Sequence, residues 1–123
     1  MKPNITALIN QLESYIELQD IAAKKIVKPD ETQFYIIGTS YSANPFFVIV
    51  ITFSKNEVIG AISAPFDVEG LLQLMADEDE FNFDYKYIYP ICNKNTMCTD
   101  IQYPLVHLMR KGEELYKEEG GAL

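Results

Sequence analysis

The sequence of 123 residues contains one histidine, so any mechanism in which an imidazole activates a serine or a cysteine must use His107. On the helix predicted for this segment, His107 lies away from the apolar stripe, nearer to Arg110 and Lys111, and is expected to be solvated. A catalytic base usually lies in a shielded cleft. Residues 38–42 resemble a nucleophile elbow, but Ser42 stands where the second glycine is needed. The sequence therefore predicts a protein that is not an enzyme.

Metal ligands are too few or wrongly spaced for the usual sites. Cys92, Cys98 and His107 supply three ligands, whereas a structural zinc ion needs four. The acidic residues 77–84 concentrate oxygen ligands, but an EF-hand loop beginning at residue 77 needs glycine at its sixth position, where Asn82 stands. We therefore expect neither a metal ion nor a cofactor.

The acidic residues are concentrated in the second half of the chain. The sequence has 18 acidic and 10 basic residues, a net charge of −8. Residues 1–56 hold five of each kind, so the whole excess belongs to residues 57–123. Residues 67–84 contain seven acids and no base. Two interpretations stay open: a solvated surface that keeps the protein soluble, or a surface that attracts a basic partner.

Aromatic residues lie within and after this acidic run. Tyr85, Tyr87 and Tyr89 alternate along the chain, which predicts one face of a β-strand. That face either packs beneath a helix or forms an exposed aromatic patch rimmed by acids, which a partner protein would bury. In the second case the predicted partner-binding residues are Asp77, Glu78, Asp79, Glu80, Phe81, Phe83, Asp84, Tyr85, Tyr87 and Tyr89.

The spacing of apolar residues predicts three helices that would position these groups. The first covers residues 4–23, with Asn4 as its N-cap. The second covers residues 67–76. The third has Pro104 in its first turn and is expected to end before Gly120.

Runs rich in Val, Ile, Phe and Tyr predict antiparallel strands between the helices. They cover residues 33–39, 46–53, 57–63 and 85–91, with a short strand near 97–101. The run 46–53 shows no alternation, so we expect it to be the central strand, covered on both faces. The predicted order is α-β-β-β-α-β-β-α. The chain is thus expected to form one α+β domain, an antiparallel sheet with flanking helices.

Composition excludes several functional classes. A pI near 4.5 argues against binding to nucleic acid or to anionic membranes. The longest apolar run, residues 45–53, is too short for a membrane-spanning helix, and the N-terminal residues do not resemble a signal peptide. We therefore expect a cytoplasmic protein. In that reducing compartment we expect Cys92 and Cys98 to pack as thiols in or beside the last strands. The alternative is a disulfide between them across the hairpin, which the geometry allows but a reducing compartment disfavours.

The order of elements, the size and the acidity resemble those of the class I type III secretion chaperones and the related YbjN-like small acidic proteins. The matching segments are the helix from Ile5 to Ile16, the strand group ending at Ile62, the helix with Val68, Leu71, Leu72 and Met75, and the helix through Leu105, Leu108 and Met109. The resemblance implies a homodimer that binds an unfolded segment of a secreted partner along apolar grooves. The sequence thus predicts a non-enzymatic protein-binding module.

The alternative function is that of an immunity or inhibitor protein. It would use the acids of residues 77–84 to block a basic active site on a toxin or nuclease. Ionic strength distinguishes the two functions, because an acidic plug weakens as salt screens its charges, whereas an apolar groove responds little.

Overall fold

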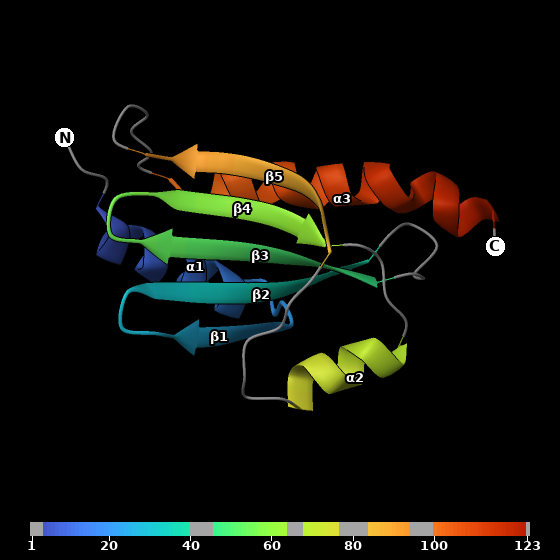
Figure 1. Cartoon of the computed structure of the whole chain (residues 1–123), viewed down its shortest axis with the longest axis horizontal. Coiled ribbons are helices and arrows are strands. Elements are labelled where there is room, and N and C mark those ends of the chain that lie inside the picture. Colours follow the sequence, from blue (N-terminus) through green and yellow to red (C-terminus); the bar gives the residue numbers. More distant parts are fainter. Residues whose placement is uncertain (1–3, 40–45, 64–67, 77–83, 94–99, 123) are drawn as a thin grey trace.

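The computed structural model describes residues 4–39, 46–63, 68–76, 84–93 and 100–122. These contain α1 (Ile5–Leu18), β1 (Ala23–Val27), β2 (Glu31–Thr39), β3 (Phe46–Ser54), β4 (Val58–Ser63), α2 (Val68–Ala76), β5 (Tyr85–Cys92) and α3 (Gln102–Ala122). The strands form one antiparallel sheet in the order β1-β2-β3-β4-β5, with α1 and α3 behind it in Figure 1. The predicted α+β class is therefore confirmed. Within the described residues, no helix is both long and apolar enough to cross a membrane.

The central position predicted for β3 is confirmed. This strand pairs with β2 on one side and β4 on the other, so that Ile51 lies between Phe34 and Gly60. Its side chains are buried on both faces, with Ile51 in the larger core cluster and Val50 in a smaller one. A strand covered on both faces needs apolar residues at successive positions, which explains the missing alternation.

The order of elements differs from the predicted one. Four strands precede α2, because β1 (Ala23–Val27) lies between α1 and the first predicted strand. β1 is an edge strand, where lysines are tolerated and even favoured, and Lys24 and Lys25 obscured its strand character. Of the strand predicted near 97–101, residues 97–99 lie outside the described residues, and Asp100 and Ile101 are not in a strand.

Side-chain caps begin the two helices that cover the sheet. Asn4 Oδ1 accepts a hydrogen bond from the Ala7 backbone N–H at 3.1 Å, as predicted. At α3, Asp100 Oδ1 accepts from the Gln102 N–H at 3.1 Å. Gln11 of α1 accepts from the N–H of Ile101 at 3.1 Å, so the start of α3 is also tied to α1.

Helix α1 ends several residues before its predicted end, at a Schellman motif. Asp20 has a φ of 52°, in the left-handed region. The N–H of Ile21 donates to the carbonyl of Ile16, and the N–H of Asp20 donates to that of Glu17. Glycine usually occupies the left-handed position of this motif. Because Asp20 occupies it here, the sequence carries no glycine to mark the stop.

The inner face of the sheet, defined as the face toward α1 and α3, carries the main core. Leu8 and Leu12 of α1 and Leu105 and Leu108 of α3 are at most 1% exposed and form one cluster with the inner residues of the strands. Burying such a side chain contributes about 1.5–3 kcal/mol. The predicted stripes of these two helices are therefore confirmed as core.

Helix α3 approaches the sheet closely through a glycine. A Cβ on Gly38 of β2 would lie 2.5 Å from the Phe47 ring, and one on Gly112 of α3 would lie closer still. The ring therefore occupies the space that both missing side chains leave. The predicted end of this helix before Gly120 is wrong, since α3 runs to Ala122. Glycine in a helix costs about 1 kcal/mol relative to alanine, which disfavours the helix without ending it.

Candidate functional site

The predicted partner-binding residues fall only partly within the described chain. Six of them, Asp77, Glu78, Asp79, Glu80, Phe81 and Phe83, lie outside the described residues. Asp84 is exposed and pairs with Lys86 at 3.1 Å. An exposed ion pair of this kind contributes about 0–1 kcal/mol. The described part of the predicted patch is therefore Asp84 and the three tyrosines of β5.

A β-bulge places these tyrosines on two faces of the sheet. Tyr85 and Tyr87 pair with consecutive residues of β4, so Lys86 is an extra residue in β5. Tyr87 and Tyr89 pack against the inner core, whereas Tyr85 lines a groove on the opposite face and is 39% exposed. The expectation of one shared face is therefore wrong for Tyr85, because an inserted residue reverses the alternation of a strand.

The inner tyrosines contact His107 of α3. His107 Nε2 lies 3.1 Å from Tyr87 Oη, and its ring centroid lies 4.6 Å from that of Tyr89. Lys111 Nζ lies 5.3 Å from the centroid of the Tyr87 ring. The expectation of a solvated His107 is wrong, because β5 is an edge strand and the flank of α3 meets its tyrosines. These contacts join α3 to β5. Tyr87 and Tyr89 therefore follow the first interpretation of the tyrosine face, in which it packs beneath a helix.

Among the described residues, neither the cysteines nor the acidic residues form a metal site. Cys92, at the end of β5, is 1% exposed within the inner core, as predicted for a thiol packed in the last strands. Cys98 lies outside the described residues. In the part of the chain that the structure describes, no three His, Cys, Asp or Glu side chains are grouped so as to hold a metal ion.

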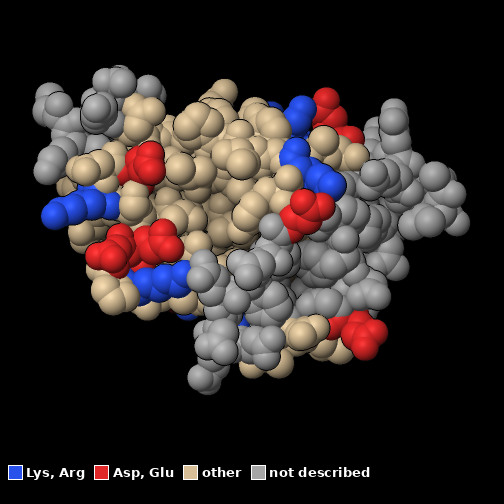
Figure 2. Space-filling view, viewed as in Figure 1, with Lys and Arg blue, Asp and Glu red and all other residues tan. Residues whose placement is uncertain are grey.

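The outer face of the sheet, opposite α1 and α3, carries a groove of about 380 Å³. Ile59 and Ala61 of β4 line it together with Tyr85 and Ile88 of β5. Ala61 is 8% exposed and Ile88 is 64% exposed, so the groove opens to solvent toward β5. Figure 2 shows this face with uncharged residues at its centre and charged side chains around its margin.

The part of the outer face nearest β2 and β3 is closed. Tyr35, Val48 and Val50 form a small cluster there and are at most 2% exposed. Tyr35 Oη donates to Gln33 Oε1 at 2.9 Å, and Gln33 Nε2 lies 3.4 Å from Thr52 Oγ1. A buried amide with partners of this kind is held in place. Gln33, Thr52 and Val50 also line the groove, so the closed part adjoins the groove directly.

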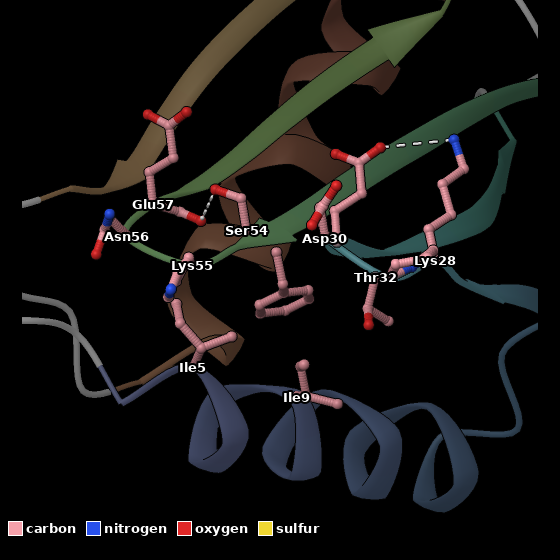
Figure 3. A pocket seen from close by; sticks show the side chains of 12 residues that line it. Ile5, Ile9, Lys28, Asp30, Thr32, Ser54, Lys55, Asn56 and Glu57 are labelled. Carbon is pink, nitrogen blue, oxygen red and sulfur yellow. Dashed lines mark hydrogen bonds and ion pairs between the residues drawn. The ribbon is translucent and has the colours of Figure 1, made fainter.

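A second cavity, of about 680 Å³, lies between α1 and the two hairpin turns of the sheet. Figure 3 shows Ile5 and Ile9 facing it from α1, with Lys55 extending toward the helix and the Glu57 carboxylate directed away. Lys28 also lines it and pairs with Glu31 at 3.5 Å. Because its lining holds both signs of charge, the cavity favours neither anionic nor cationic ligands.

Helix α2 forms where predicted but leaves apolar side chains in solvent. Leu72 is 65% exposed and Met75 is 46% exposed. In Figure 1 this helix lies beside the β1 edge of the sheet and not over β4 and β5. None of the described residues that line the groove belongs to α1, α2 or α3. Exposed apolar side chains thus occur on α2 and in the groove.

Sequence reasoning missed Ile59, Ile88 and Glu57 as groove residues. The available signal was Ile88, an apolar residue between Lys86 and Pro90 in the row that alternates with the tyrosines. An apolar residue on such a face indicates a surface that another element covers.

Comparison of the chain with protein-family models, with curated proteins and with solved structures gave no match. The groove, its charges and its exposed side chains therefore supply the evidence for function. The family resemblance stays a prediction, and the order of elements on which it partly rests differs from the observed one.

Proposed function

We propose that this protein is a non-enzymatic protein-binding module that holds a partner polypeptide against the outer face of its sheet. The observation that carries the proposal is the groove lined by Ile59, Ala61, Tyr85 and Ile88, with Ile88 64% exposed. A large aliphatic residue that is mostly solvated in a concave apolar surface favours binding of another chain.

The energetics of the groove support binding of a polypeptide. Burying the side chain of Ile88 contributes about 1–2 kcal/mol, and Tyr85 offers a large ring with a hydroxyl that can stay hydrated. A few anchors of this kind dominate many protein interfaces. The partner-binding set in this proposal therefore keeps Tyr85 and adds Ile59 and Ile88.

The homodimer implied by the resemblance belongs to the same proposal. Light scattering after gel filtration tests it directly, and a clean monomer at micromolar concentration would remove the secretion-chaperone form of the function. Binding through the groove by a monomer would leave the protein-binding module itself intact.

Site-specific photo-crosslinking tests the proposed function. A benzoylphenylalanine placed at Ile88 is expected to capture a partner polypeptide in the native host, because that position faces the groove. The matched control is the same group at Val27 of β1, which is 68% exposed and does not line the groove. Equal capture at both positions, or none at Ile88, contradicts the proposal.

The crosslinked complex also distinguishes the inhibitor alternative. A partner held by apolar contacts should stay bound as NaCl rises from about 0.05 to 0.5 M, whereas a partner held by the acids of residues 77–84 should dissociate. Replacing Asp77, Glu78, Asp79 and Glu80 by Asn or Gln should then leave capture at Ile88 unchanged under the proposed function.

A further inference from the structure

The groove on the outer face combines apolar side chains with unbalanced negative charge. Glu31 and Glu57 line it together with Ile59 and Ile88, and none of the described residues that line it is a lysine or an arginine. Figure 2 shows acidic and basic side chains beside one another at the end of this face where the two hairpins turn. The groove therefore has a carboxylate end and an aliphatic floor.

The basic residues of the same hairpins are directed elsewhere. Lys28 and Lys55 line the cavity beside α1, and in Figure 3 Lys55 extends toward that helix while the Glu57 carboxylate is directed away. Lys28 pairs with Glu31 at 3.5 Å. Glu57 is exposed and has no ion pair with any described residue. Among the described residues, the unbalanced charge at the groove is therefore the negative charge of Glu57.

The groove lies on a sheet face, and a helix is one of the elements that cover such faces. Its walls are side chains of the sheet, and the layers that pack on sheet faces are helices or a second sheet. α1 and α3 already cover the inner face, and no residue of α1, α2 or α3 is among the described residues that line the groove. An amphipathic helix would place an apolar stripe on Ile59 and Ile88 and charged flanks at the rim.

A second copy of this chain does not match the charge of the groove. α1 carries Glu13 and Glu17 and no basic residue, and α2 carries Glu69 and no basic residue. In α3, Arg110 and Lys111 are followed, after one glycine, by Glu113 and Glu114. Helices of this chain would therefore bring carboxylates toward Glu57, which is unfavourable.

We infer that the groove takes a basic amphipathic helix of another protein, with its apolar stripe on Ile59 and Ile88 and a lysine or arginine beside Glu57. This inference rests on the proposed function and names the chemistry of the partner. It assigns affinity to the apolar contacts and selectivity to the carboxylate end.

Peptide binding measured by fluorescence anisotropy tests the inference. The probe is a labelled peptide of about 18 residues with leucines on one helical stripe and lysines on its flanks, compared with a twin carrying glutamates and with a scrambled lysine peptide. The lysine peptide is expected to bind at least tenfold more tightly than either of the others. The scrambled peptide has the same charge but no apolar stripe.

Variants of the protein locate the binding. Ile88→Ser should weaken the lysine peptide about tenfold, and Glu57→Gln should weaken it about threefold and reduce its dependence on salt. The matched controls are Val27→Ser and Glu17→Gln, which change an exposed aliphatic residue and an exposed carboxylate outside the groove. Circular dichroism of each variant verifies that the fold is intact.

The outcomes separate this inference from the proposed function. If the glutamate twin binds as tightly as the lysine peptide and Ile88→Ser weakens both, the charge inference is overturned and the protein-binding groove stands. If the scrambled peptide binds equally well, or if Val27→Ser acts like Ile88→Ser, the groove is not the site and the inference is overturned. No binding by any peptide also overturns it, while crosslinking at Ile88 judges the proposed function independently.

Discussion

The two faces of the sheet are built from the same strands, yet one is closed and the other is partly open. On the inner face, Ile49, Ile51 and Ile62 are fully buried beneath α1 and α3. On the outer face, Val50 is 2% exposed but Ile88 is 64% exposed. Both faces are apolar, so hydrophobicity alone does not distinguish a core from a surface.

The difference lies in what each face meets. The inner face meets two helices whose stripes were readable in the sequence, and a face covered in this way stabilises the fold. On the outer face, the described residues that line the groove belong to strands or to the turn between β3 and β4. The comparison teaches that apolar residues of the inner face contribute to stability, whereas those of the groove are available for binding.

The largest expected difference between the two faces is in the free energy of unfolding when one apolar side chain of each is replaced by alanine. Leu108→Ala removes a fully buried side chain and is expected to lower the free energy of unfolding by about 2–5 kcal/mol, whereas Ile88→Ala should change it by less than about 0.5 kcal/mol. Urea denaturation followed by circular dichroism measures both. A cost for Ile88→Ala as large as that for Leu108→Ala would mean that both faces are closed.

The close approach of α3 to the inner face gives the next largest effect. Gly112→Ala should lower the free energy of unfolding by about 1–2 kcal/mol, although alanine favours a helix, because its Cβ would overlap the Phe47 ring. Adding Phe47→Leu should recover part of this loss, which thermal unfolding of the single and double variants would show. A stabilised Gly112→Ala protein would contradict the close packing.

The hydrogen bond between β5 and α3 should contribute less. Tyr87→Phe is expected to cost about 1 kcal/mol, because it removes the hydroxyl 3.1 Å from His107 Nε2. Tyr103→Phe, on a tyrosine that is 74% exposed, is the matched control with no expected effect. In a His107→Ala background the cost of Tyr87→Phe should fall. An unchanged cost there would show that the two side chains are not coupled.

The smallest effect is expected at the end of α1. Asp20→Gly should raise the free energy of unfolding by about 0.5 kcal/mol, because glycine adopts the left-handed conformation without a steric cost. Asp20→Ala should not stabilise the protein. Peptide binding to the outer groove should be equal in all three proteins, since residue 20 does not line it. Destabilisation by glycine would contradict the Schellman ending.

Much of the fold was predictable because its signals are local. The stripe of α1, the cap at Asn4 and the unbroken apolar run of β3 are each contained in one short segment. β1 was missed because its lysines suit an edge strand as well as a helix end, and the end of α1 was missed because Asp20 replaces the usual glycine. For β1 the deciding partner is the distant strand β2, whereas the end of α1 is a local motif that lacks its usual glycine.

The site was less predictable for the same reason. Tyr85 was predicted as a binding residue, but the bulge at Lys86 that moves it to the outer face depends on pairing with β4. His107 was expected in solvent because its neighbours on the helix are polar, whereas its tyrosine contacts come from β5. Glu57 and Ile88 are 31 positions apart and become neighbours in a groove only through the sheet.

The sequence by itself determined the α+β class, the helical stripes, the central strand and the concentration of acids after residue 56. These properties depend on spacing and composition, which act over one or two turns of helix or one strand. Only the tertiary structure decided which apolar row is covered, on which face each tyrosine lies, and that Glu57 faces away from the lysine beside it. Those outcomes depend on strand register and helix placement, which arise from contacts between distant segments.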